Sequence, residues 1–145
     1  MPLRMFDTRT DIDMEMMKAV VCTGYGPPEV LQVTRRPRPV PGNDEVLVRV
    51  YATSVTNSDI FIRGSKVALR MLIPFRLMMG ITRPRKEIPG EVLAGEVVQT
   101  GSNVKRLRVG DRVYGLTGFT LGACAEYACL KDVVSKRGGL AIMPK

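Results

Sequence analysis

Alternation of hydrophobic and polar residues is the main pattern along this chain. It is clearest over residues 45–54, where Val46, Val48 and Val50 share one face of an extended segment and Arg49 lies on the other. Successive side chains of a β-strand point to opposite faces, so this alternation predicts a strand with one buried face.

Similar patterns rich in β-branched residues predict further strands elsewhere. They are expected over residues 18–23, 30–36, 92–100, 112–114, 123–130 and 140–143. Glycine and proline separate these segments, and proline cannot donate to a sheet ladder. A short helix is expected over residues 58–63, with Asn57 or Ser58 as its cap. Many short strands with such punctuation predict a mainly β fold with short helices, either a barrel or a sandwich.

Residues 64–87 interleave apolar and basic side chains. The apolar members are Val67, Leu69, Met71, Leu72, Ile73, Phe75, Leu77, Met78 and Met79, and the basic members are Lys66, Arg70, Arg76, Arg83, Arg85 and Lys86. The favoured interpretation is an amphipathic helix packed on the β-structure with its charges in solvent. The second is a mobile lid over a substrate pocket, because methionine adapts to irregular ligands. The third is an anchor on a membrane surface.

The length of 145 residues is that of one domain. Residues 1–16 mix acidic and basic side chains without an apolar core. That composition fits neither a mitochondrial presequence nor a secretory signal, so a disordered leader is expected there. The folded domain is therefore expected over residues 17–145, beginning at Met17.

The net charge of +8 would suit an anionic partner. The basic residues are spread along the chain, however, and aromatic residues make up only 6% with no tryptophan, so a base-stacking surface is poorly supplied. Nucleic acid is therefore not expected as a partner. No apolar run approaches the ~18 residues of a membrane-spanning helix, and a membrane partner is disfavoured.

The chain has three cysteines and no histidine, which limits the redox chemistry and the metal sites to be expected. An odd cysteine count argues against a disulfide framework and for a reducing compartment, so a cytoplasmic location is expected. Cys22, Cys124 and Cys129 are scattered and are expected to be small buried thiols. No metal site is expected, because zinc needs a close set of such ligands.

Four motifs resemble the amino-terminal domain of the medium-chain dehydrogenase/reductase superfamily. They are VTNSD at residues 55–59, PGEVLAG at 89–95, GDRV at 110–113 and AEY at 125–127. The resemblance covers residue 17 to the end and is closest to the zinc-independent, quinone-oxidoreductase-like branch. It implies a GroES-like β-barrel that forms the substrate side of a two-domain enzyme.

The second domain of that superfamily binds the dinucleotide. Its phosphate-binding turn needs a G-x-G-x-x-G run between a strand and a helix. Residues 1–145 contain no such run. The chain is therefore expected to hold only the first domain, to have almost no affinity for NADP or NAD by itself, and to be inactive alone.

The resemblance also implies independence from zinc. Zinc-dependent members place a cysteine where this chain has Thr56 and a histidine where it has Glu91. They also insert a four-cysteine lobe after the turn that corresponds to residues 110–113. A threonine cannot replace a thiolate, and one carboxylate does not make a site. Glu91 is expected to be a solvated charge at a strand edge.

By the same resemblance, Thr56 and Asn57 are expected to line the cleft near the nicotinamide, and Asp59 to shape it. Zinc-independent relatives often carry asparagine where Thr56 stands. Without a metal, a hydroxyl, an amide or a bound water must polarise the substrate carbonyl. Thr56 and Tyr114 are the candidate catalytic hydroxyls. The alternatives are that Thr56 and Asn57 cap a helix and that Asp59 forms an ion pair with Arg63.

The expected function is the substrate-side domain of an NAD(P)H-dependent oxidoreductase. Its substrate is expected to be a small carbonyl compound, an enone or a quinone, and both quinone-reductase and alcohol-dehydrogenase chemistry remain open. The alternative is a non-enzymatic module for interaction or oligomerisation, with residues 64–87 as its contact segment. A homodimer is an expected assembly, because the barrel face that a second domain would cover is otherwise exposed.

Overall fold

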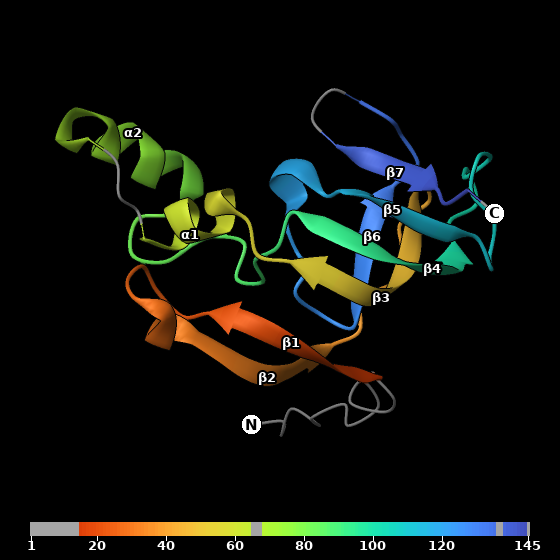
Figure 1. Cartoon of the computed structure of the whole chain (residues 1–145), viewed down its shortest axis with the longest axis horizontal. Helices are drawn as coiled ribbons and strands as arrows, with labels where there is room; N and C mark the ends of the chain where they lie inside the picture. The colour runs from red at the N-terminus through yellow and green to blue at the C-terminus, as the bar shows by residue number, and fades with distance from the viewer. Residues whose placement is uncertain (1–14, 65–67, 136–137, 145) are drawn as a thin grey trace, which may run out of the picture.

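The computed structural model describes residues 15–64, 68–135 and 138–144, and its mainly β architecture is drawn in Figure 1. Its strands are β1 (Met16–Cys22), β2 (Leu31–Pro37), β3 (Glu45–Ser54), β4 (Val92–Thr100), β5 (Arg112–Leu116), β6 (Tyr127–Lys131) and β7 (Gly139–Ile142). Its helices are α1 (Asn57–Gly64) and α2 (Leu69–Met79), and single 3-10 turns cover Pro28–Val30 and Gly118–Thr120.

The strands form two antiparallel sheets. The larger has the order β6-β3-β4-β5-β7, and it curls so that its edge strands β6 and β7 also come into contact. The β1–β2 hairpin forms the smaller sheet beneath it in Figure 1. An isolated bridge between Ala19 and Ala125 joins β1 to the segment before β6, and the amide of Val20 donates to the carbonyl of Cys124 at 2.9 Å.

Alternate residues of the central strands fill the core. Val46 and Val48 of β3, Leu93 and Val97 of β4 and Val113 of β5 are completely buried in one cluster. Hydrophobic burial of this kind is the main favourable term in folding. Leu47, although it points away from Val46 and Val48, is also buried. This end of β3 is therefore covered on both faces.

Among the predicted boundaries that differ from the structure, two differ because of contacts that are distant in sequence. The strand expected over residues 123–130 pairs with β3 only from Tyr127 onward. The residues before it bond mainly to β1 and to the turn before β4, and the amide of Cys124 donates to the carbonyl of Pro89 at 3.0 Å. At the other end, β1 begins at Met16, and the amide of Arg38 donates to the carbonyl of Glu15 at 2.7 Å.

The expected leader at residues 1–16 therefore overlaps the fold at Glu15 and Met16, and residues 1–14 lie outside the described residues. Arg38 also forms an ion pair with Glu15. Within the segment 64–87, Gly64 ends α1, and among residues 68–87, which the structure describes, a helix forms over residues 69–79. It ends at Gly80, which has a φ of 125° and whose amide donates to the carbonyl of Arg76 at 2.8 Å.

Both helices lie at one end of the molecule, beyond the end of β3 (Figure 1). The rings of Phe61 in α1 and Phe75 in α2 meet edge to face, with centroids 5.8 Å apart.

The loop after β1 contacts both helices. The amide of Gly26 donates to the carbonyl of Arg63 in α1 at 3.0 Å. The Tyr25 hydroxyl donates to the carbonyl of Gly80 after α2 at 2.8 Å, and the Arg76 guanidinium stacks over the Tyr25 ring. None of the helices in the described part of the chain has both the length and the apolarity needed to cross a bilayer.

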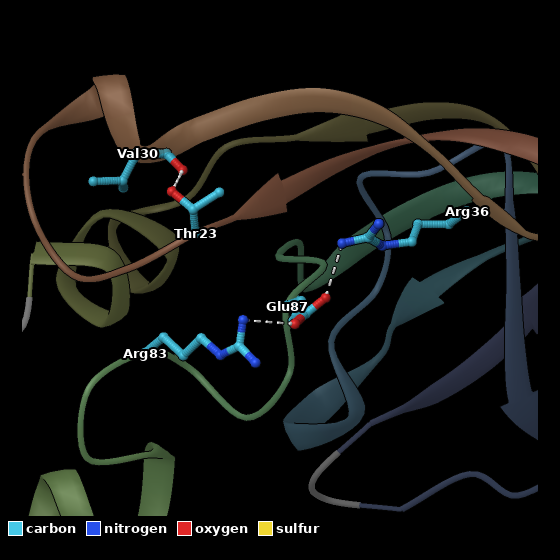
Figure 2. Close-up of polar contacts among 5 residues, drawn as sticks. All are labelled: Thr23, Val30, Arg36, Arg83 and Glu87. Carbon is cyan, nitrogen blue, oxygen red and sulfur yellow. Dashed lines mark hydrogen bonds and ion pairs between the residues drawn. The ribbon is translucent and has the colours of Figure 1, made fainter.

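The segment that returns from α2 to β4 is fixed to the small sheet through Glu87. Its carboxylate accepts from Arg36 of β2 at 3.1 Å and pairs with Arg83 at 3.5 Å, as Figure 2 shows. The main-chain amide of Cys22 donates to the Glu87 carbonyl at 2.7 Å. The hydroxyl of Thr23 closes the nearby β1–β2 connection by donating to the carbonyl of Val30 at 3.0 Å (Figure 2).

The close pairing of β3 and β4 can be tested by a substitution at Gly95. A Cβ atom added at Gly95 would lie 2.0 Å from the carbonyl oxygen of Arg49, a main-chain atom that cannot move aside cheaply. We expect Gly95→Ala to lower the free energy of unfolding by about 1–3 kcal/mol, measured by urea denaturation. Gly24→Ala is the matched control, since no heavy atom lies within 4 Å of its added Cβ. Equal stabilities for the two variants would contradict this strand pairing.

Candidate functional site

A cavity of about 570 Å³ lies between the two helices and the ends of the large sheet. Its lining residues come from α1, from α2, from the residue before β4 and from the turn after β5: Asn57, Ser58, Phe61, Ile62, Phe75, Met78, Met79, Glu91, Phe119 and Leu121. Polar groups are confined to Asn57, Ser58 and Glu91, and the rest of the wall is aromatic or aliphatic. A mostly apolar cavity with a few grouped polar side chains is the usual form of a small-molecule site.

The first turn of α1 is fixed by a reciprocal capping arrangement. Thr56 precedes the helix, and its main-chain amide donates to Asp59 Oδ2 at 2.8 Å. The Asp59 amide points back to Thr56 Oγ1 at 3.4 Å. A hydroxyl residue at the cap with an acidic residue three positions later is the capping box. The predicted alternative that Thr56 caps a helix therefore fits the structure.

The other carboxylate oxygen of Asp59 reaches across to the turn before β4. Asp59 Oδ1 accepts from the amide of Gly90 at 3.1 Å. The carbonyl of the same glycine accepts from the buried hydroxyl of Thr117 at 3.1 Å and from the amide of Ala123 at 3.2 Å. Gly90 has a φ of 105°, and a Cβ atom there would lie 2.7 Å from the Cys124 nitrogen, so only glycine fits. The carboxylate of Asp59 thus ties α1 to Gly90, and the carbonyl of Gly90 is in turn bonded to two further segments of the barrel.

These contacts limit what Thr56 can do chemically. Its hydroxyl donates to Asp59 Oδ2 at 3.0 Å, so its one proton is already used in this arrangement. The side chains of Asn57 and Ser58, in contrast, line the cavity from the first turn of α1. The structure therefore brings Thr56, Asn57 and Asp59 together, and it points to Asn57 and Ser58 as the polar groups facing a ligand.

Tyr114, the other predicted catalytic hydroxyl, lies in a different place. It is half-exposed on β5, where it pairs with Ala94 and Ala141. It lines a second hollow of about 390 Å³ over β3, β4 and β5, next to Thr53 and Ser54. The lining of the helix-bounded cavity does not include Tyr114.

Two further sequence interpretations can be compared with the structure. The predicted ion pair between Asp59 and Arg63 is wrong. Asp59 takes part in none of the ion pairs among the described residues, and its carboxylate accepts from the amides of Thr56 and Gly90 instead. Glu91 is half-buried at the cavity wall rather than fully solvated. Phe119 and Leu121 were not recognised as site residues, because their turn carries no motif and reaches the cavity only through the fold.

Burial dominates the chemistry of the three thiols. Burial raises the pKa of Cys124, and the charge of Asp59 raises it further, although a hydrogen bond with Thr53 lowers it. Burial also raises the pKa of Cys22. Burial and the charge of Glu45 raise the pKa of Cys129 to about 11. All three are free thiols, and a thiol with a raised pKa is a poor nucleophile at neutral pH. Across residues 15–64, 68–135 and 138–144, no three Cys, Asp or Glu side chains are grouped to hold a metal ion.

Comparison with protein families identifies the fold. The family described as the alcohol dehydrogenase GroES-like domain matches residues 42–139. The chain belongs to this family. Both the GroES-like β-barrel and the resemblance to medium-chain dehydrogenases/reductases of the quinone-oxidoreductase branch are thereby confirmed.

Individual relatives agree with this assignment. The chain is 38% identical to the chloroplastic quinone-oxidoreductase homolog of Spinacia oleracea, over 81% of this chain and 33% of that protein. The quinone oxidoreductase of Coxiella burnetii is 28% identical with a TM-score of 0.66, over 81% of this chain and 35% of that one. The Escherichia coli quinone oxidoreductase complexed with NADPH is 25% identical with a TM-score of 0.64, over 90% of this chain and 33% of that one. The chain thus spans about one third of these relatives.

The capping arrangement predicts a clear stability effect. Replacing Asp59 by alanine leaves the amides of Thr56 and Gly90 without their acceptor, so we expect the free energy of unfolding to fall by about 1–2 kcal/mol in urea denaturation. Thr56→Ser is the matched control, because serine keeps both the amide and the hydroxyl. If Asp59→Ala were as stable as the unaltered chain, the carboxylate would not have this structural role.

Proposed function

We propose that this chain is the substrate-side domain of an NAD(P)H-dependent, zinc-independent oxidoreductase that reduces quinones or enones. The observation that carries the proposal is the cavity between α1 and α2, which is apolar except at the first turn of α1 and at Glu91. Such a wall suits a flat, largely apolar carbonyl compound. The relatives named as quinone oxidoreductases support the same reaction class.

The described residues suit only one end of a dinucleotide. The Asn57 amide offers a donor and an acceptor at the cavity, which suits the carboxamide of a nicotinamide. The chain has no glycine-rich phosphate-binding turn, so the remainder of the cofactor would have to be held by another domain. When bound, the reduced cofactor, NADPH or NADH, would supply hydride. The Escherichia coli relative, whose structure is a complex with NADPH, supports this choice of cofactor.

The contribution of this chain is orientation, exclusion of water and polarisation of the carbonyl. Phe61, Phe75 and Met79 would hold the apolar body of the substrate against α1 and α2. The Asn57 amide and the Ser58 hydroxyl would donate to the carbonyl oxygen as it gains negative charge. Thr56 and Asp59 would act as positioning residues, since they fix the first turn of α1. A direct catalytic role for Thr56, Asp59 or Tyr114 stays a prediction.

Independence from zinc is part of the proposal. The residues at the family's two ligand positions are Thr56, whose hydroxyl is bonded to Asp59, and Glu91 in the cavity wall. Neither offers the thiolate or imidazole of a zinc-dependent member. A cytoplasmic location and a homodimer also stay predictions, and the Spinacia oleracea relative is named chloroplastic.

A non-enzymatic interaction module is the second candidate function. The exposed apolar side chains of α2, among them Leu69 and Ile73, favour it. The two functions differ in what the cavity does, because only the enzymatic one requires a small ligand between α1 and α2.

Ligand binding can be followed at methionine methyl groups by NMR. On titration with 1,4-naphthoquinone, we expect shifts at Met78 and Met79, which line the cavity, and none at the exposed Met71. Phe75→Ala should weaken binding about tenfold by removing apolar wall. Val40→Ala, at an exposed position remote from the cavity, is the control. Unchanged methyl signals of Met78 and Met79 at saturating ligand would contradict this placement.

The affinity of this chain for NADPH tests whether the chain supplies only the substrate side of the enzyme. Because residues 1–145 lack the phosphate-binding turn, we expect no micromolar binding of NADPH to this chain in titration calorimetry. The naphthoquinone titration, run on the same sample, controls for folded protein. A micromolar Kd for NADPH would contradict the view that this chain supplies only the substrate side.

A further inference from the structure

The outward face of α2 carries an apolar stripe that is largely exposed. Leu69, Ile73 and Leu77 follow one another at intervals of four, so they lie on one side of the helix. Their exposed fractions are 83%, 70% and 58%. Contiguous exposed apolar surface of this kind marks an interaction site.

The opposite face of the same helix is already occupied. Phe75 and Met79 are half-buried, line the cavity, and Phe75 meets Phe61 of α1. The exposure of the stripe is therefore not a consequence of a loosely placed helix. In Figure 1, α2 lies at the far end of the molecule from β7, where an extended surface can reach it.

The charged residues nearest to the stripe along the sequence are all of one sign. From residue 65 to residue 86 the sequence holds six lysines and arginines and no aspartate or glutamate. Arg70 borders the stripe within α2, and Arg85 and Lys86 are exposed on the segment that follows. The next acidic residue, Glu87, is already paired with Arg36 and Arg83 (Figure 2).

We propose that the apolar stripe of α2, together with Arg70 in the same helix and the exposed cations Arg85 and Lys86 that follow it, binds the surface of an anionic lipid membrane. Exposed large apolar side chains beside arginines and lysines are the features of helices that lie in the bilayer interface. Basic groups near the surface are attracted by anionic headgroups. The absence of acidic residues over residues 65–86 favours this occupant over a protein surface of mixed charge. The proposal goes beyond the oxidoreductase reaction and does not require it.

Co-sedimentation of the full chain with vesicles tests the proposal. We expect binding to phosphatidylcholine vesicles that contain phosphatidylglycerol and little binding to phosphatidylcholine alone. Ile73→Glu should reduce partitioning at least about tenfold, because it places a carboxylate in the stripe. Val40→Glu makes the same charge change at a side chain that is 79% exposed outside α2, and should keep most of the binding. The double variant Arg70→Gln, Lys86→Gln should weaken binding roughly thirtyfold.

A fluorescence experiment tests the same contact without the charge-changing variants, whose stability could affect co-sedimentation. The chain contains no tryptophan, so a single introduced indole reports only its own position. With anionic vesicles, the emission of Ile73→Trp should shift to shorter wavelength as the ring enters the interface. The emission of Val40→Trp should not shift.

Four results would overturn the proposal. They are no binding to either vesicle, equal binding to neutral and anionic vesicles, equal losses for Ile73→Glu and Val40→Glu, and a concentration-dependent emission shift of Ile73→Trp without lipid. The last result would show that a second copy of the chain covers the stripe. None of these measurements uses cofactor or substrate, so they leave the proposed reaction independently testable.

Discussion

The side chain of Asp59 holds together the region on which the candidate site depends. It closes the first turn of α1 through Thr56 and reaches the amide of Gly90 in the turn before β4. Gly90 in turn is held by Thr117 and by the segment before β6. A half-buried carboxylate with several amide and hydroxyl donors is well satisfied, whereas the same amides without it would be left unpaired. The direction of α1, and hence the cavity between α1 and α2, follows from these bonds.

The barrel was largely predictable from local patterns, and its exceptions have a common cause. The strands β3 and β4 have the bounds that alternation predicts, because one face of each faces a core that excludes water. The segment before β6 departs from the prediction because it bonds to β1 and to Pro89, which are distant in sequence. The same holds for the site. The grouping of Thr56, Asn57 and Asp59 follows from their spacing at a helix start, but neither the Gly90 contact nor the position of Tyr114 can be deduced from neighbouring residues.

The helix α2 shows why composition alone left three interpretations open. An eleven-residue helix with a proline inside it is marginal by itself, so it must be stabilised from one side. That side is the one with Phe75 and Met79, and it also forms the cavity wall. The same face thus packs on α1 rather than, as the favoured interpretation expected, on the β-structure, and it lines the pocket that the lid interpretation requires. Mobility of such a lid stays a prediction. The membrane-surface interpretation concerns the opposite face, where Leu69, Ile73 and Leu77 remain exposed. The three are not exclusive, because each face of one helix can meet a different environment.

The placement of Thr56 links the absence of a zinc-type ligand set to the proposed chemistry. At a position where zinc-dependent relatives carry a metal-binding thiolate, this chain has a hydroxyl that is bonded to the residue three positions later. In this arrangement the Thr56 proton is directed to Asp59 rather than to a developing oxyanion. We therefore infer that polarisation moves along the helix start to Asn57 and Ser58, whose side chains line the cavity. The capping box is then a prerequisite of the site rather than a competitor to it, since it fixes the helix turn that presents both groups.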